Sequence, residues 1–291
     1  MKSKTKKMTK RERKDNLWGW FLVSPIIFKL IVFNTIPTLF CLFVSFTDYN
    51  MLGQIGSRIT KFTLDAYKDV LSSQAFWQSM GNTLFYMLGI PIRLFVGFLL
   101  ACAVNAKFLK GKTVFRVLYY MPAVATAMAI AIVWKWFFNA EGLLNALLGT
   151  NISWLQDPMT VKPALILKGI WGGVGGTMLM YLAGMQNISE EIYEQASLDG
   201  ATAWIKMIKI TMPLLGPITL YNVITGIANG MNAFGENYTM VSSTASSTAI
   251  WWTYGQFTGG NYPVASAAAF MITVVTILLS IPSYRKLIQQ F

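Results

Sequence analysis

The feature that most limits how this chain can fold is a series of six long apolar runs. A transmembrane helix needs about 20 consecutive, mostly apolar residues. The fifth run is the least apolar because it contains three asparagines and Glu236, and the first contains Pro25 and Pro37, which predict a kink or a tilt. The sequence therefore predicts an all-α integral membrane protein with six transmembrane helices, at residues 18–46, 82–104, 114–138, 164–185, 218–240 and 266–284.

Composition supports this class and argues against several others. Of the 291 residues, 12% are charged, against roughly 25% in an ordinary soluble domain. The net charge of +12 does not indicate nucleic-acid binding, because eight of the 24 Lys and Arg lie in the first fourteen residues. A basic tail beside an apolar run is typical of a cytoplasmic anchor on anionic lipid. Histidine is absent, and Cys41 and Cys102 lie inside apolar runs, so we expect neither a metal site nor a membrane enzyme.

The distribution of basic residues predicts the orientation of the spans. Cytoplasmic loops carry an excess of Lys and Arg. Both termini are therefore expected in the cytoplasm, with residues 1–16 as a basic tail and residues 17–291 as one transmembrane domain. Four of the basic residues lie in the connections 47–81, 139–163 and 241–265, and sixteen lie in the tail, in 105–116, in 186–216 and from Arg285 onward.

The connection between the fourth and fifth runs, residues 187–217, carries signals for two short helices. Ser189 is a suitable N-cap, and the acids of the first turn suit the positive end of the helix dipole, which predicts a helix to about Leu198. Asp199 and Gly200 then predict a turn. A second helix is expected to start near Ala201 and to stop before Pro213. A helix lying on lipid is the alternative, but such helices prefer Lys and Arg on their polar face.

The sequence EQASLDGATAWIKMIKITMPLLGP resembles the cytoplasmic EAA signature of permease subunits in binding-protein-dependent ABC importers. Gln195 and Met212 are mild departures from that signature. The stretches FWQSMGNTLFYML and FRVLYYMPAVATAMAIAIVWKWFFNAEGLLNALL are similar to the carbohydrate branch of the family, which includes the larger maltose-permease subunits. The resemblance covers roughly residues 17–285, although VSSTASST replaces the Gly-Gly-Pro that often follows the fifth span.

This resemblance implies a heteromeric importer in the bacterial cytoplasmic membrane. The expected partners are a second, different permease subunit, two ATPase subunits, an extracellular sugar-binding protein, a carbohydrate substrate and membrane lipid. ATP and Mg are used by the ATPase, while this chain binds no cofactor and has no GxxxxGK[ST] phosphate loop. The residues expected to couple the chain to the ATPase are Glu191, Glu194, Ala196, Asp199, Gly200, Ala201 and Pro213.

Polar side chains inside apolar runs, together with the resemblance, suggest where substrate binds. Amide side chains donate and accept hydrogen bonds and so suit hydroxyl-rich ligands, although hydrogen bonds between helices are an equal alternative for the asparagines. Close helix packing is the alternative for Gly175 and Gly176. Glycines where related chains have larger residues suggest a roomy cavity. The resemblance places Trp171, Gly172, Gly173, Gly176, Gly226, Asn229 and Asn232 at or beside the sugar site.

Other transport mechanisms remain open from the sequence. A secondary transporter needs its own ion or proton relay, for which Glu236 is the only acid in a predicted span. An ABC permease for another small polar solute, such as a polyamine or a phosphate ester, is a further alternative. We expect Lys135 and Lys168 to reach a membrane interface, and Arg93 to face protein or a wet cavity with a partner that the sequence does not name.

Overall fold

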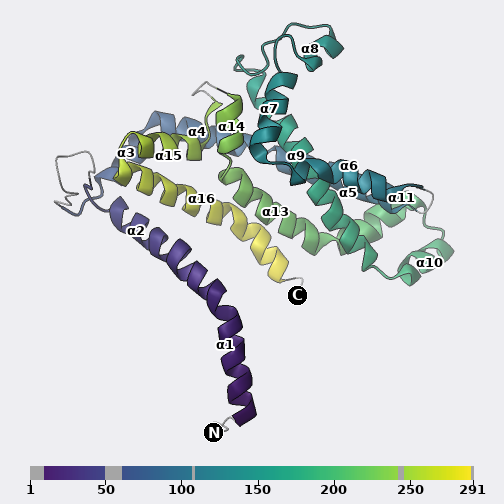
Figure 1. Ribbon diagram of the computed structural model, residues 1–291. Coiled ribbons are helices and arrows are strands. Elements are labelled where there is room, and N and C mark those ends of the chain that lie inside the picture. The colour runs from purple at the N-terminus through teal and green to yellow at the C-terminus, as the bar shows by residue number, and fades with distance from the viewer. Residues whose placement is uncertain (1–9, 50–60, 107–108, 242–245, 290–291) are drawn as a thin grey trace.

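The protein is described by a computed structural model that covers residues 10–49, 61–106, 109–241 and 246–289, and these ranges are almost entirely helical (Figure 1). Within them the chain has no β-strand, only one isolated bridge between Thr47 and Phe62. The helices are α1 (Lys10–Leu30), α2 (Ile36–Ser45), α3 (Asp65–Ser72), α4 (Gln74–Tyr86), α5 (Gly89–Asn105), α6 (Lys112–Val124), α7 (Ala127–Phe137), α8 (Leu143–Leu148), α9 (Val161–Gln186), α10 (Glu190–Leu198), α11 (Ala203–Lys206), α12 (Met212–Leu214), α13 (Gly216–Met231), α14 (Gly235–Met240), α15 (Ala249–Thr258) and α16 (Tyr262–Ile288), with π-helical segments η1 (Ile31–Thr35) and η2 (Met207–Thr211).

The helical fold is confirmed, with four to six helices that could cross a membrane. Four stretches without a sharp bend are sufficiently long and apolar: Asn16–Ser45, Gln74–Asn105, Val161–Gln186 and Tyr262–Ile288. Two further candidates are bent pairs, α6 with α7 at 99° and the 203–214 stretch with α13 at 63°. The count reaches six if each bent pair is one span.

Two of the predicted runs are not single helices. Residues 114–138 break after Val124, where Thr126 adopts an extended conformation and its hydroxyl accepts a hydrogen bond from the Ala129 N–H at 3.3 Å to cap α7. Residues 218–240 break after Met231, because Asn232 ends α13 and a separate short helix, α14, follows. Hydropathy does not register a change of backbone direction inside an apolar run, so it predicted neither break.

Two prolines are accommodated by a wider turn of helix. A proline in a helix has no N–H and clashes with the carbonyl four residues earlier. The π-helical segment η1 immediately precedes the Ile36–Pro37 pair, and η2 immediately precedes Met212–Pro213. The helix therefore continues through Pro213 to Leu214, rather than stopping before that proline as predicted.

Close approach between helices depends on small residues. α9 packs along α5 and α6 in the centre of the molecule. A Cβ atom at Gly175 of α9 would lie 1.9 Å from the carbonyl oxygen of Tyr119 on α6. Gly175 thus lets two helix backbones touch, as small residues do at helix interfaces in membranes.

A second group of helices lies beside this centre. α13, α15 and α16 lie side by side, with α3 and α4 against them (Figure 1). Their shared apolar cluster includes Val70, Phe76, Met231 and Ala268, all at most 3% exposed.

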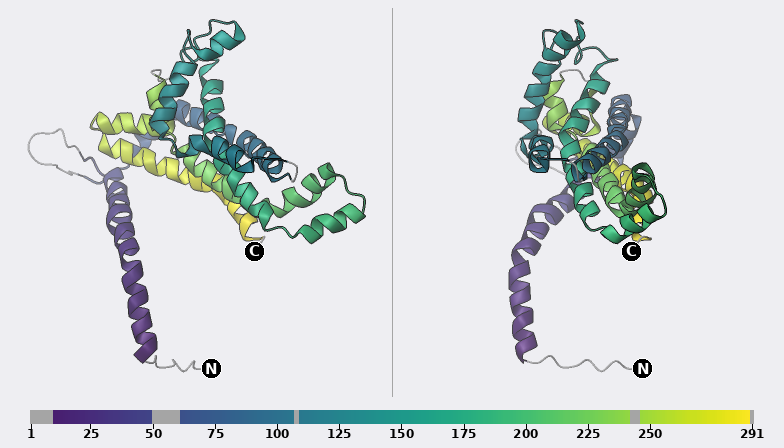
Figure 2. Two further views of the ribbon diagram at one scale, coloured as in Figure 1. Left: turned by 45° about the vertical axis from the view of Figure 1, so that its right-hand side comes forward. Right: turned by 90° about the vertical axis from the view of Figure 1, so that its right-hand side faces the viewer.

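The first helix stands apart from the rest. In each view α1 leads away from the other helices, and only the far end of α2 meets them (Figures 1 and 2). That end is fixed by the hydroxyl pair of Ser45 and Tyr67, 2.8 Å apart, and by the Cys41 Sγ and Ser266 Oγ atoms, 3.4 Å apart. The most apolar window of Asn16–Ser45 has no buried residue. An apolar surface of this size needs lipid or another protein to cover it.

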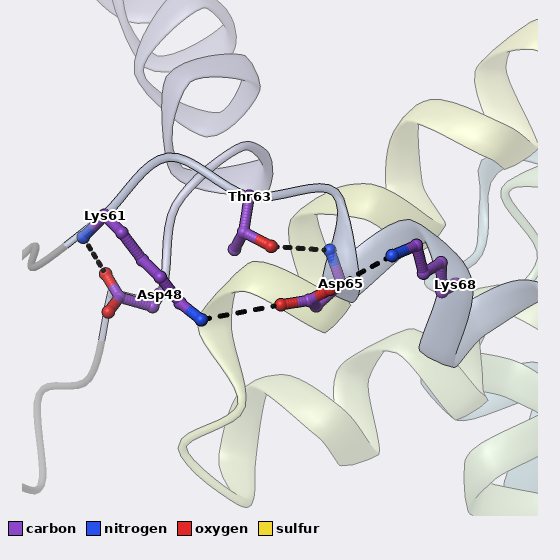
Figure 3. A network of polar contacts seen from close by, with 5 residues as sticks. All are labelled: Asp48, Lys61, Thr63, Asp65 and Lys68. Carbon is purple, nitrogen blue, oxygen red and sulfur yellow. Dashed lines mark hydrogen bonds and ion pairs between the residues drawn. The ribbon is translucent and has the colours of Figure 1, made fainter.

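A polar network ties the start of α3 to the end of α2 (Figure 3). The backbone N–H of Lys61 donates to the Asp48 carboxylate at 3.1 Å. The Asp65 carboxylate pairs with Lys68 at 3.4 Å and with Lys61 at 3.8 Å. The Thr63 side chain and then the Lys68 ammonium lower the pKa of Asp65 below its usual value. Since Lys61, Asp65 and Lys68 are exposed, the network orders the connection more than it stabilises the whole fold.

Candidate functional site

A cavity of about 560 Å³ lies where three interruptions of the helices meet. Its walls come from the turn between α4 and α5, the break between α6 and α7, the first half of α9, and the end of α13 with the start of α14. Irregular backbone is tolerated at membrane depth only where protein buries it or where it lines a water-filled cavity. The position of the breaks therefore marks this cavity as the polar interior of the membrane domain.

The breaks have local causes in the sequence. Thr126 caps α7 and starts it in a new direction. Beyond Met231, Asn232 turns its side-chain amide back to the carbonyl of Ala228 at 2.8 Å. Asparagine favours such local bonds over continuing a helix. Met87 and Leu88 form the turn that separates α4 from α5, four residues before Pro91.

The polar side chains of the described residues that line the cavity are two cations, three amides and the Tyr86 phenol. Arg93 comes from α5, Lys168 from α9, and the amides belong to Asn229, Asn232 and Asn237. Asn229 is exposed in the cavity, whereas Asn237 is buried. No Asp or Glu is among the described residues that line the cavity.

Arg93 is held between two glycines on different helices. A Cβ at Gly173 of α9 would lie 2.7 Å from Cδ and 2.9 Å from one terminal nitrogen of Arg93. A Cβ at Gly226 of α13 would lie 2.9 Å from the other terminal nitrogen. A larger residue at either place would have to displace the guanidinium. The Nε atom of Arg93 is buried and has no hydrogen-bond partner within the described part of the chain.

The structure brings together five of the seven residues predicted to contact substrate. Trp171 and Gly176 are not among the described lining residues. The Trp171 ring instead packs edge-on against Trp134, with centroids 5.5 Å apart. The five that line the cavity are Gly172, Gly173, Gly226, Asn229 and Asn232.

The glycines do not all enlarge the cavity. A Cβ at Gly172 would meet nothing within 4 Å, so that position leaves open space. At Gly173 and Gly226 the space is filled by Arg93. The roomy cavity expected from the sequence is thus partly occupied by a cation that sequence reasoning had not placed there.

Of the two lysines that the sequence predicts at a membrane interface, Lys168 lies elsewhere. Lys168 is 4% exposed and lines the cavity, rather than reaching a membrane interface. Lys135 is exposed at the end of α7 and donates to the carbonyl of Thr239 at 3.4 Å. The position of Lys168 inside the predicted run 164–185 was the available signal, since ionisable groups inside spans commonly mark a functional site.

A second candidate region is the hairpin of α10 and α11, which lies at the end of the molecule opposite α3 and α15 (Figure 1). Ser189 caps α10 by accepting from the Glu191 N–H at 3.3 Å, as predicted. Gly200 has φ +74°, a left-handed conformation that glycine adopts readily, so the predicted turn is confirmed. The Thr202 hydroxyl caps α11 by accepting from Ile205 N–H at 3.4 Å.

The outer surface of this hairpin combines acids with apolar side chains. Glu191, Glu194 and Asp199 are exposed. Leu198 is 89% exposed and Trp204 is 64% exposed. On the inner side, the Tyr193 and Thr211 hydroxyls are 2.9 Å apart and Lys206 donates to Ser197.

The remaining predicted coupling residues lie on the same segment. Ala196 and Ala201 are half-buried, Gly200 is exposed at the turn, and Pro213 lies in α12. The hairpin therefore presents a mixed acidic and apolar surface and is tied on its inner side to the helix that leads into α13.

A helical membrane domain whose broken helices surround a polar cavity is the architecture of a solute transporter. Comparison with known families agrees: residues 93–285 match the family described as binding-protein-dependent transport system inner membrane component. The chain belongs to this family of ABC-importer permeases, and it is accordingly a transport component and not an enzyme.

Individual relatives agree over most of the chain. It is 36% identical over 246 residues to the probable ABC transporter permease protein YesP of Bacillus subtilis (strain 168), covering 80% of this chain and 76% of that protein. It is 30% identical to the lactose transport system permease protein LacF of Rhizobium radiobacter, covering 91% of each. A bacterial ABC transporter involved in the import of the acidic polysaccharide alginate contains a chain of the same fold, with a TM-score of 0.81, 23% identity, and 96% and 98% of the two chains covered.

Proposed function

We propose that this chain is the permease subunit of an ATP-driven importer for a sugar or oligosaccharide, and that it forms half of the translocation pathway. The observation that carries this proposal is the cavity of about 560 Å³ among broken helices, lined by neutral amides. Amides that donate and accept suit hydroxyl groups. The similarity to a permease named for lactose transport supports a carbohydrate as the solute.

The proposed topology has six spans, with each bent pair counted as one and both termini in the cytoplasm. α9 has 26 residues, or about 39 Å at ~1.5 Å per residue, enough to cross a hydrocarbon layer of about 30 Å. Its ends then lie on opposite sides of the membrane. The positive-inside rule puts the α10 end in the cytoplasm. The protein would reside in the bacterial cytoplasmic membrane.

In this proposal the segment 187–217 docks an ATPase subunit. Exposed Leu198 and Trp204 would enter a groove of the partner, and Glu191, Glu194 and Asp199 would meet basic groups at its rim. The ATPase would bind ATP and Mg. A second permease would complete the pathway, an extracellular binding protein would deliver the sugar, and lipid would cover part of α1 and α2.

The test is reconstitution of the complex purified through this subunit. We expect ATPase subunits and a second permease to co-purify, and sugar uptake into proteoliposomes to require ATP and the binding protein. Uptake that collapses with an ionophore and continues without ATP would instead indicate an ion-coupled secondary transporter. If ATP drives the uptake of a non-sugar solute and of no sugar, the protein is still an ABC importer, but its substrate is not a carbohydrate.

Docking has its own test by cross-linking. With Cys41 and Cys102 replaced, Leu198→Cys should form a cross-link to the ATPase. Met159→Cys is the matched control, because it is also strongly exposed but lies at the other end of α9. Equal cross-linking at both positions, or none at Leu198→Cys, would contradict the proposed docking surface.

A further inference from the structure

The chemistry of the cavity narrows the class of substrate, an inference that rests on the proposed function. We propose that the transported saccharide carries an anionic group, such as a uronate carboxylate or a sulfate ester, and that Arg93 binds that group. The substrate would then be an acidic sugar or oligosaccharide rather than a neutral one.

The first observation is a guanidinium without a counter-ion among the described residues. Arg93 makes no hydrogen bond or ion pair there, and the described ion pairs are those of Asp65 with Lys61 and Lys68, near the start of α3. A charged side chain inside a membrane span is costly unless it is paired or faces a wet cavity. Arg93 faces the cavity, so an anion that enters the cavity would be a favourable partner.

The second observation is the cradle that holds Arg93 in place. Gly173 and Gly226 belong to different helices, and their missing side chains leave the space in which the two terminal nitrogens lie. The guanidinium in this space presents a planar fork of donors, which matches the two oxygens of a carboxylate or a sulfate.

The third observation is what surrounds the guanidinium. Asn229 and Asn232 line the same cavity, and both are exposed there. Their amides can bind the hydroxyl groups of a sugar ring while Arg93 binds its charged group. Lys168 of α9 also lines this cavity. The cavity thus combines sites for neutral hydroxyls with one fixed cationic site.

The experiment uses the complete permease–ATPase complex in nanodiscs. Binding is measured without the binding protein, so that the selectivity of that protein does not enter. The probes are trisaccharides of galacturonate, mannuronate and guluronate, each paired with its carboxyl-reduced counterpart, and one sulfated trisaccharide. ATP-driven uptake of the same probes is then measured in proteoliposomes that include the binding protein.

We expect an acidic probe to bind and to be transported in preference to its neutral counterpart. Arg93→Gln should weaken binding of the acidic probe about ten- to a hundredfold, the loss expected for hydrogen bonds to a charged group. Binding of the weaker neutral probe should change less than about twofold. Arg93→Lys, which keeps the charge and loses the fork, should retain the preference at reduced affinity. If the complex does not assemble with Arg93→Gln, Arg93→Lys tests whether Arg93 binds the anionic group.

Arg116→Gln is the matched control. Arg116 lies on α6, also has a buried Nε without a partner in the described part of the chain, and is not among the described cavity residues. Arg116→Gln should leave the ratio of the affinities for the acidic and the neutral probe unchanged. A preference for the sulfated probe over the uronates would identify the anionic group as a sulfate ester.

Two results would overturn the inference while leaving the proposed function intact. One is binding and uptake of neutral probes only. The other is an equal loss of acidic and neutral binding in Arg93→Gln, which would mean that Arg93 supports the structure or balances an acid of this chain, Glu236 included. If ATP drives uptake of no saccharide, the proposed function fails and this inference fails with it.

Discussion

The hydroxyl groups of Tyr193 and Thr211 lie 2.9 Å apart and join α10 to the π-helical segment η2. Thr211 also donates to the carbonyl of Lys206 at 3.3 Å within the widened turn. Through α12 this turn leads directly into α13, whose far end lines the cavity. The Tyr193–Thr211 bond therefore connects α10, in the proposed docking segment, to the turn that leads through α12 into the proposed pathway helix α13.

Removing this bond should weaken the coupling of ATP hydrolysis to transport. Tyr193→Phe deletes one hydroxyl and leaves the ring in place, at a cost of about 1 kcal/mol. We expect less sugar transported per ATP hydrolysed, with little change in the thermal stability of the complex. Tyr284→Phe, at an exposed tyrosine of α16, is the control. An unchanged ratio of transport to hydrolysis in Tyr193→Phe would show that the bond carries no coupling.

Adding a methyl group at Gly175 should separate α6 from α9. The new Cβ would lie 1.9 Å from the Tyr119 carbonyl oxygen, and backbone atoms cannot move aside as a flexible side chain can. We expect Gly175→Ala to destabilise the domain by about 1–3 kcal/mol, seen as a lower midpoint of thermal unfolding in detergent. Gly176→Ala is the neighbouring control, since its Cβ meets nothing within 4 Å. Equal midpoints for the two variants would contradict the tight contact.

Replacing Asn145 should open the connection between α8 and α9. Its amide nitrogen donates to the carbonyls of Ala140 at 2.9 Å and Ile152 at 2.8 Å, and its oxygen accepts from Trp154 Nε1 at 2.8 Å. Asn145→Ala leaves these groups without partners, each at a cost of about 1–3 kcal/mol.

The expected result is faster amide hydrogen exchange in residues 146–156. Asn151→Ala, at an exposed neighbouring position, should not change that exchange. Protection of this segment that survives Asn145→Ala would mean that other contacts hold it.

The pKa of Asp65 predicts where the polar network of Figure 3 is lost. The carboxyl has a folded pKa below its usual value of 3.8. A group whose pKa is lowered by folding stabilises the folded state at pH values above its pKa in the unfolded chain. That stabilisation is lost as the pH falls through its pKa in the folded chain. The amides of α3 should therefore be better protected against hydrogen exchange in the unaltered protein than in Asp65→Asn. This difference should be constant between about pH 5 and 8.

That difference should disappear in acid, below the folded pKa of Asp65. The measurement is amide exchange across α3, corrected for the intrinsic effect of pH on exchange. A difference that changes between pH 5 and 8, or that persists after Asp65 is protonated, would contradict the assignment. Lys68→Gln should shrink the difference, because it removes one cause of the pKa shift.

Local features of the hairpin were predictable because they depend on neighbouring residues. The N-cap at Ser189 and the left-handed Gly200 are determined within a few residues of sequence. The extent of the second helix was not, because a π-helical turn lets the chain pass Pro213. Whether a proline ends a helix or widens it depends on what packs around it, and the local sequence does not contain that information.

The sequence by itself determined the membrane class, the helical architecture, the hairpin and five of the residues that line the cavity. Apolar runs of sufficient length predict the membrane class and the helices, because burial in lipid depends on composition, and capping and turn residues predict the hairpin. The five cavity residues came from the resemblance to the permease family. Tertiary structure alone decided that the breaks after Tyr86, Val124 and Met231 meet at one cavity, and that Gly173 and Gly226 make room for Arg93. Those relations join residues 80 or more positions apart along the chain, from Arg93 to Gly173 and Gly226, and only the packing of the helices brings them together.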